Sequence, residues 1–166
     1  MGLVVTREEL KQVVRAQKEQ NKIIVTTNGC FDILHVGHVR YLAEARRLGD
    51  VLIVGVNTDD SVRRLKGPSR PVNNENDRAE VLASLECVDY VTLFPEDTPV
   101  ELLTEVKPNF HAKGGDYDPE KLAETPVVES FGGQVKIINL VPGKSTTSLI
   151  AKIDKSKEKS NDTVNC

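Results

Sequence analysis

His35 and His38 flank Gly37 in a segment whose residue types could bind phosphate. The β-branched residues 23–25 suit a buried strand, and residues 38–48 have the three-and-four spacing of an amphipathic helix. His35 is therefore expected to end a loop, and His38 to lie in the first helical turn. Free amides at a helix start carry the positive end of the helix dipole, and Gly37 would let an anion approach them. Two imidazoles at that point could donate hydrogen bonds to phosphate oxygens.

Two other interpretations of the histidine pair remain open. His-x-x-His can place two zinc ligands on one face, but a catalytic zinc usually takes three protein ligands, and the only other histidine is His111. The pair could also simply satisfy local backbone groups. We favour the phosphate interpretation and predict no protein-bound metal.

A second candidate anion site lies near the end of the chain, where Ser145, Thr146 and Thr147 follow a strand and open a helix. Their hydroxyls and free amides could hold phosphate oxygens, whereas a plain N-cap would use only one hydroxyl. The preceding Gly143-Lys-Ser resembles part of a P-loop. That motif needs a glycine where this chain has Ile138, so we reject the P-loop interpretation.

Three basic side chains are candidates to contact an anionic ligand. Residues 66–71, Lys-Gly-Pro-Ser-Arg-Pro, cannot form a helix or a central strand and are expected to be a loop near the ligand crevice. Lys66 and Arg70 lie in this loop, and Arg78 lies in the helix behind Asn74. Such side chains are usually just solvated, but a phosphate group bound in the crevice would require positive charge beside it.

Polar residues also stand at expected strand ends that face the crevice. Asp32 and Asn57 could bind a polyhydroxylated substrate there. The segment Lys113-Gly114-Gly115-Asp116 ends another strand, and its glycines would let the backbone approach a flat ring or adopt positive φ. A simple turn would have a similar composition.

Alternating strands and helices are expected to position these residues. Expected strands cover residues 23–27, 51–56, 90–94, 110–113 and 134–140, and expected helices cover 37–48, 74–86 and 145–155, with a short helix from 59. A capping box, Thr6-Arg-Glu-Glu9, opens an earlier helix to about residue 20, and Thr98 is expected to cap another. This order predicts an α/β, Rossmann-like fold: a doubly wound parallel sheet of about five strands with helices on both faces.

Length and composition favour one domain that handles small molecules. Of 166 residues, 39% are hydrophobic and 28% charged, enough for a single core. We divide the chain into an N-terminal helix packed on the core (1–21), a main domain (22–155) and a disordered polar tail (156–166). The net charge is -3 and basic and acidic residues are interspersed, so the sequence has no basic patch that would bind nucleic acid. No apolar run approaches the roughly 20 residues that cross a membrane. Three cysteines without paired or metal-type spacing indicate a reducing, cytoplasmic compartment.

The segment Asn28-Gly-Cys-Phe-Asp-x-Leu-His-x-Gly-His38 resembles the hallmark of the cytidylyltransferase-like nucleotidyltransferase superfamily. Residues 65–73 (Leu-Lys-Gly-Pro-Ser-Arg-Pro-Val-Asn), 113–117 (Lys-Gly-Gly-Asp-Tyr) and 145–147 (Ser-Thr-Thr) follow in the order of one branch. That branch is the D-glycero-β-D-manno-heptose 1-phosphate adenylyltransferase, which occurs alone or as the C-terminal half of a bifunctional heptose kinase/adenylyltransferase. The resemblance covers residues 22–153.

The resemblance implies transfer of AMP from ATP, with Mg²⁺, to a sugar 1-phosphate by direct in-line attack, and it suggests a homodimer. It implies catalytic roles for His35, His38, Lys66 and Arg70, and sugar contacts for Asp32, Asn57 and Asp116. The implied nucleotide-binding residues are Thr27, Asn28, Gly29, Phe31, Gly37, Arg78, Lys113, Gly114, Gly115, Ser145, Thr146 and Thr147.

Three rival functions remain open. Within the superfamily, the chain could be a cytidylyltransferase for glycerol phosphate or ethanolamine phosphate, or a flavin-forming adenylyltransferase. A nucleotide-binding module without turnover is a rival of another class, against which His35, His38 and Lys66 argue. A NAD-binding domain would rest on topology alone, because no Gly-x-Gly-x-x-Gly follows the first strand.

Overall fold

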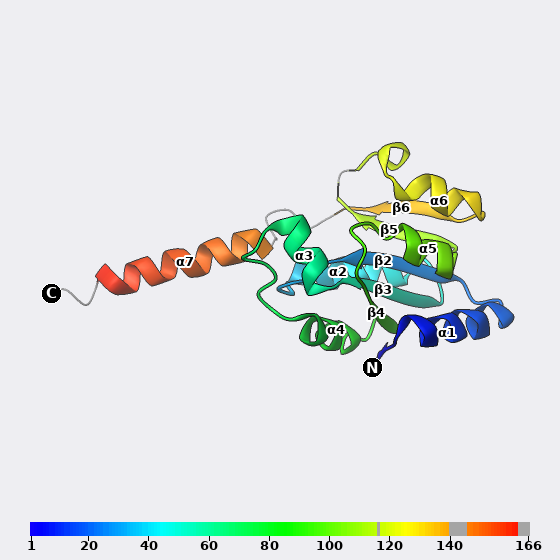
Figure 1. Cartoon of the computed structure of the whole chain (residues 1–166), viewed down its shortest axis with the longest axis horizontal. Coiled ribbons are helices and arrows are strands. Elements are labelled where there is room, and N and C mark those ends of the chain that lie inside the picture. The colour runs from blue at the N-terminus through cyan, green and yellow to red at the C-terminus, as the bar shows by residue number, and fades with distance from the viewer. Residues whose placement is uncertain (116, 140–145, 163–166) are drawn as a thin grey trace.

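The protein is built on one parallel β-sheet with helices on both faces (Figure 1). The computed structural model describes residues 1–115, 117–139 and 146–162. Within these described residues, six strands lie in the order β1-β4-β3-β2-β5-β6, and each neighbouring pair is parallel. The strands are β1 (Leu3–Val4), β2 (Ile24–Gly29), β3 (Val51–Asn57), β4 (Tyr90–Phe94), β5 (Phe110–Gly114) and β6 (Gln134–Ile138).

Helices connect these strands, and the last one, α7, extends away from the rest of the molecule in Figure 1. None of the described helices is long and apolar enough to cross a membrane. The helices are α1 (Arg7–Glu19), α2 (Val36–Arg46), α3 (Asp59–Lys66), α4 (Glu75–Ala83), α5 (Val100–Val106), α6 (Glu124–Ser130) and α7 (Thr146–Asp162), with a 3₁₀ turn at Pro119–Lys121.

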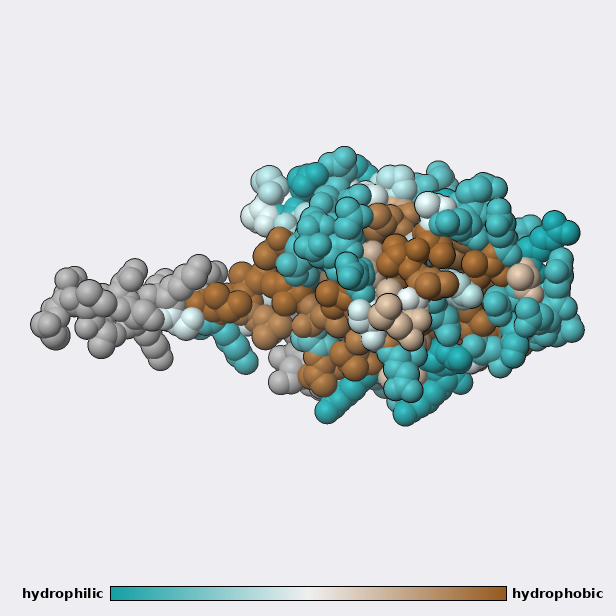
Figure 2. Space-filling view, turned by 90° about the horizontal axis from the view of Figure 1, so that it is seen from below, coloured by the Kyte–Doolittle hydropathy of each residue, from teal (hydrophilic) through white to brown (hydrophobic). Residues whose placement is uncertain are grey.

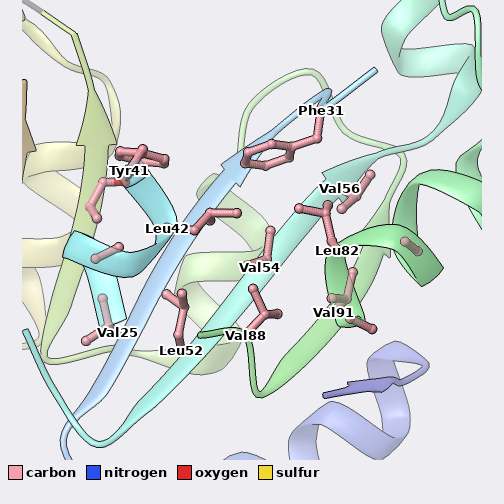
Figure 3. Close-up of a cluster of buried hydrophobic side chains, with 14 residues drawn as sticks. Val25, Phe31, Tyr41, Leu42, Leu52, Val54, Val56, Leu82, Val88 and Val91 are labelled. Carbon is pink, nitrogen blue, oxygen red and sulfur yellow. Dashed lines mark hydrogen bonds between the residues drawn. The ribbon is translucent and has the colours of Figure 1, made fainter. Parts of the chain in front are cut away.

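Two hydrophobic layers hold the helices to the sheet. On one face, side chains of α2 and α4 such as Leu42 and Leu82 pack against β2 and β3 (Figure 3). On the other face, Leu10 of α1 and Leu102 of α5 pack against Ile53 of β3. Every residue of β3 is buried, as expected for a central parallel strand covered on both sides.

The structure confirms the Rossmann-like prediction and corrects its details. The sixth strand, β1, is too short for a periodic pattern to reveal it, and α6 was not predicted. The capping box at Thr6 is present, but Pro99 rather than Thr98 is the N-cap of α5, and no side chain caps it. Of the tail that we expected to be disordered, residues 156–166, the part up to Asp162 continues the helix α7, and residues 163–166 lie outside the described residues.

The sheet order places a ligand crevice beside β2. Successive strands after β2 add on one side, as β3 and β4, and the chain then crosses to add β5 and β6 on the other. Ligands of doubly wound sheets bind at such a switch point, outside the carboxyl ends of the strands. The segments after β2, β3 and β5 should therefore form the functional site.

His111 lies in the sheet at this switch point, where β5 pairs with β2. It is 1% exposed, and its Nδ1 lies 2.9 Å from the Thr26 hydroxyl. Nε2 of His111 is buried and has no hydrogen-bond partner in the part of the chain that the structure describes. Burial, with the nearby charge of Lys113, lowers the pKa of His111 from 6.5 to about 4.

We expect the variant His111→Gln to lose less stability in acid than the wild type. With a pKa near 6.5 in the unfolded chain, His111 takes up a proton there that the folded protein excludes. Its contribution is present above pH 6.5 and is lost as the pH falls toward 4, on the order of 3 kcal/mol. Urea unfolding at about pH 7 and pH 4 measures this difference, and an equal acid loss in both proteins would contradict the assignment.

Candidate active site

A cavity of about 560 Å³ opens at the carboxyl ends of β2, β3 and β5. The loops and helix starts that follow these strands supply its walls. The predicted site residues that line it are Asn28, Gly29, Phe31, Asp32, His38, Asn57, Lys66, Arg70, Lys113, Gly114, Thr146 and Thr147. The fold thus brings together motifs that lie far apart in the sequence.

The two histidines stand at the start of α2, as predicted. His35 is the N-cap of α2, and its Nδ1 accepts a hydrogen bond from the Gly37 amide at 3.1 Å. Because that nitrogen accepts, a neutral His35 carries its proton on Nε2. The His38 ring stacks on His35, with ring centroids 3.8 Å apart. His38 lines the cavity, whereas His35 and Gly37 are not among its lining residues, so His38 is the better placed to touch a ligand.

His38 is held neutral by its surroundings. Burial, with the adjacent His35, lowers the pKa of His38 from 6.5 to about 4. Its Nδ1 is buried and finds no hydrogen-bond partner among the described residues. The Phe31 ring packs edge-on against His38, with centroids 5.3 Å apart, and shields it from water. At neutral pH the imidazole therefore has one N–H with which to bind a ligand.

Phe31 shapes the wall beside His38 from an uncommon backbone conformation. Its φ is +46°, in the left-handed region that residues other than glycine rarely adopt. A Cβ at Gly29 would lie 3.0 Å from the Phe31 ring, so a side chain at this position would displace the ring. Unfavourable conformations of this kind persist where the surrounding structure enforces them, often at functional sites.

Asp32 anchors the loop that follows α3. Its carboxylate accepts hydrogen bonds from Arg70 Nε at 2.5 Å and from the amides of Val72 and Asn73 at 2.8 and 3.0 Å. The Asn73 side chain donates to the Asp32 carbonyl at 2.6 Å. The Asp32 side chain is only 1% exposed. We predicted that Asp32 contacts the sugar. These hydrogen bonds instead favour a structural role, in which Asp32 holds the loop in place.

The same loop carries positive charge to the cavity. Lys66 is the last residue of α3 and is exposed at the cavity edge. Arg70 borders the cavity while its Nε is held by Asp32. Both side chains therefore remain candidates to contact phosphate groups.

Arg78, which we predicted to bind nucleotide, is used inside the protein. It is 2% exposed and lies outside the cavity lining. Its guanidinium donates to the carbonyls of Asn73, Cys30 and Asn57 and to the Asp59 carboxylate. Arg78 thus ties together the segments after β2 and β3, which favours a structural role.

Thr27 is a second predicted nucleotide contact that lies beneath the cavity. The Tyr41 hydroxyl donates to the Ala112 carbonyl at 2.9 Å, so it accepts from the Thr27 hydroxyl, 2.5 Å away. This buried chain of hydrogen bonds joins β2, α2 and β5.

Asn57, which we predicted to contact the sugar, does line the cavity, but its side-chain amide donates to Ser61 at 3.0 Å.

The end of β5 forms another wall of the cavity. Lys113 Nζ donates to Glu124 Oε1 at 2.6 Å, and Glu124, the first residue of α6, also lines the cavity. Burial alone would raise the pKa of Glu124, but the hydrogen bond and charge of Lys113 outweigh it and hold the pKa below its usual value. Gly115 follows with a φ of +132°, as expected for a glycine that makes such a turn. Gly115 does not line the cavity.

The start of α7 contacts the segment of residues 28–38 that contains the two histidines. Thr146 donates a hydrogen bond from its hydroxyl to the Ile33 carbonyl at 3.3 Å, and Thr147 follows it along the cavity wall. Ser145 and Asp116, which we predicted to bind nucleotide and substrate, lie outside the described residues. Their roles stay predictions.

The cytidylyltransferase-like family model matches residues 26–153, from β2 into α7. The chain belongs to the cytidylyltransferase-like family. This membership confirms the superfamily that the histidine motif indicated.

Relatives within this cytidylyltransferase-like family are closely similar over most of the chain. The Bifunctional protein HldE of Syntrophotalea carbinolica is 54% identical over 147 residues, which are 89% of this chain and 30% of that protein. The Bifunctional protein HldE of Actinobacillus pleuropneumoniae is 54% identical over 154 residues, which are 93% of this chain and 32% of that protein. The chain therefore spans about a third of the length of these relatives.

Solved structures support the same fold. The lipopolysaccharide core biosynthesis protein from Thermoplasma volcanium is 35% identical, with a TM-score of 0.60, and the match covers 72% of this chain and 97% of that one. The pantoate-beta-alanine ligase from Francisella tularensis, complexed with beta-gamma ATP and beta-alanine, has a TM-score of 0.54 at 14% identity, covering 84% of this chain and 67% of that one. The second likeness concerns the fold alone.

Sequence reasoning missed several residues that line the cavity of this cytidylyltransferase-like protein. Asp97 and Pro99 follow β4, so the rule that ligands lie at strand ends could have found them. Tyr41 lies one helical turn after His38 and could have been found by spacing. No sequence pattern pointed to Glu124, and the helix that it begins was not predicted. The missed residues are Cys30, Tyr41, Leu65, Asp97, Thr98, Pro99, Tyr117 and Glu124.

Proposed function

We propose that this chain is an adenylyltransferase that transfers AMP from ATP to D-glycero-β-D-manno-heptose 1-phosphate and releases pyrophosphate. The observation that carries the proposal is that His38, Lys66, Arg70 and the start of α7 line one cavity at the carboxyl ends of the strands. The 54% identity to the HldE proteins and the motifs at residues 65–73 and 113–117 support the choice of the heptose branch.

In this reaction the sugar phosphate oxygen attacks the α-phosphorus of ATP in line, and pyrophosphate leaves. A phosphate monoester is largely ionised near neutral pH, so neither a general base nor a protein nucleophile is needed. His38 would donate its N–H to the phosphate oxygens on which charge develops, while His35 holds the His38 ring in place. Lys66 and Arg70 would neutralise the attacking and leaving groups, and the start of α7 would hold the triphosphate.

ATP is proposed to enter as its Mg²⁺ complex. Within residues 1–115, 117–139 and 146–162, no three His, Cys, Asp or Glu side chains are placed to hold a metal ion. The Asp32 carboxylate, moreover, is already occupied by Arg70 and two backbone amides. Mg²⁺ usually keeps phosphate oxygens and water among its ligands. The described side chains therefore fit a Mg²⁺ ion that is bound by the triphosphate. The ion would neutralise phosphate charge there.

We further propose that the protein works as a cytoplasmic homodimer with small-molecule partners and no nucleic acid. Figure 2 shows hydrophobic residues along the first part of α7 and over the adjoining face of the body. Val36 and Val39 of α2 and Ile153 of α7 are exposed by 42%, 38% and 52%. Exposed apolar surface of this kind often marks an interface. Sedimentation equilibrium tests the assembly, and a monomer at all concentrations would contradict it.

Pyrophosphate release by the purified protein with Mg²⁺ tests the function. We expect turnover with ATP and the heptose 1-phosphate, and none with CTP. A preference for CTP, or turnover only with glycerol phosphate, ethanolamine phosphate or FMN, would overturn the substrate assignment and keep the mechanism. Nucleotide binding without pyrophosphate release from any of these pairs would instead favour a binding module.

A further inference from the structure

Glu124 places a carboxylate in the wall of a cavity that is proposed to bind a highly anionic nucleotide. Its Oε1 accepts a hydrogen bond from Lys113 Nζ at 2.6 Å, and the side chains of Glu124 and Lys113 are 8% and 21% exposed. A carboxylate there repels phosphate groups unless its charge is balanced. Its partner Lys113 supplies that balance.

The pair restricts the Lys113 side chain. A lysine side chain has four rotatable bonds and samples many rotamers when its ammonium is free in water. Lys113 is the last residue but one of β5 and Glu124 begins α6, so the hydrogen bond fixes the ammonium between two elements of the fold. His111 lies two residues earlier in the same strand and is buried and neutral, so it adds no competing charge.

The chemistry of the paired groups differs from that of the other basic residues. An ammonium and a carboxylate in contact carry no net charge together, so they attract a triphosphate weakly. They do present a donor beside an acceptor, which suits ribose hydroxyls or the polar edge of a base. Lys66 and Arg70 come to the cavity from α3 and the loop after it, a different wall. The wall made by Lys113 and Glu124 therefore fits the uncharged nucleoside part of a nucleotide.

We propose that Glu124 is a positioning residue that holds Lys113 against the nucleoside part of the bound nucleotide. The inference rests on the proposed nucleotidyl transfer and assigns to Glu124 a role that acts through Lys113. It predicts that loss of the carboxylate weakens recognition of the nucleoside and does not weaken recognition of the phosphates.

Isothermal titration calorimetry tests the role of Glu124. Wild type, Glu124→Gln and Glu129→Gln are each titrated with ATP or with inorganic tripolyphosphate, in the presence of Mg²⁺ and without sugar phosphate. Glu129 lies exposed on the same helix and provides the matched control. In Glu124→Gln the amide oxygen can still accept from Lys113 but carries no charge, so we expect the Kd for ATP to rise about tenfold, with tripolyphosphate binding not weakened. Glu129→Gln should bind like wild type.

Coupling to Lys113 is tested in the same assay. Lys113→Met should weaken ATP binding to a similar extent, and the double variant with Glu124→Gln should be no weaker than Lys113→Met alone. In turnover, Glu124→Gln should raise the KM for ATP while kcat and the KM for the sugar phosphate stay within about twofold. Glu124→Asp retains the charge, should recover part of the affinity, and keeps the test possible if the glutamine variant does not fold.

Unchanged ATP affinity in Glu124→Gln, an equal loss for ATP and tripolyphosphate, or additive effects with Lys113→Met would each overturn the inference. A wild-type protein that binds no nucleotide would overturn it together with the proposed function. Wild-type binding of ATP without pyrophosphate release would refute the proposed function alone, because the titrations do not depend on turnover.

Discussion

Replacing His38 with alanine is expected to lower kcat by about a hundredfold or more, with a smaller change in the KM for ATP. His38 lines the cavity, and its ring is fixed between the stacked His35 and the edge of Phe31. A donor that is already oriented and shielded from water stabilises charge that develops in the transition state more than it stabilises bound substrate. A hundredfold loss corresponds to about 2.7 kcal/mol of that stabilisation.

Steady-state pyrophosphate release at saturating ATP and sugar phosphate measures this loss. His38→Gln is the informative companion, because its amide keeps an N–H donor of similar reach and should retain more activity than alanine. Thermal unfolding of both variants separates a loss of donor from a loss of fold. A kcat within a few-fold of wild type for His38→Ala would remove His38 from the chemical step.

Replacing Asp32 with asparagine is expected to lower the free energy of unfolding by about 3 kcal/mol, because it leaves the partly buried Arg70 guanidinium without its counter-charge. Asp32 has a side chain only 1% exposed and balances Arg70, whose side chain is 19% exposed. An asparagine has only one side-chain oxygen, so its NH₂ group would face either the amides of Val72 and Asn73 or Arg70, all of which now donate to the carboxylate. Because the loop carries Arg70 to the cavity, kcat/KM should fall at least about tenfold even where the variant is folded.

Urea unfolding and pyrophosphate release measure the two effects. Asp60→Asn is the matched control: Asp60 has a side chain 78% exposed and pairs with Arg63 on the surface, where an ion pair contributes little. The control should keep wild-type stability and activity. If Asp32→Asn unfolds at the same urea concentration as wild type, the loop is held by other contacts. If only activity changes, Asp32 contacts substrate as first predicted.

Local patterns in the sequence were sufficient for most of the fold. The capping box at Thr6 and the helical period of residues 38–48 each depend on residues close in the chain, so both are recognisable from the sequence alone. The alternation of strands and helices then implied the parallel, doubly wound sheet. Elements that escaped prediction are short: β1 has only two residues, and α6 has seven. Such segments form because neighbouring elements supply their partners, which no local period records.

The sequence by itself determined which segments would meet at the ligand crevice, since the carboxyl ends of parallel strands share one edge of the sheet. The tertiary structure decided which side chains remain free to touch a ligand there. Asp32, Arg78 and Thr27 have the right chemistry, but the structure binds them to partners inside the protein. Residues far apart in the chain supply these partners, as Arg70 does for Asp32. A buried polar group must find such a partner, and only the packed arrangement of the whole chain determines which one it is.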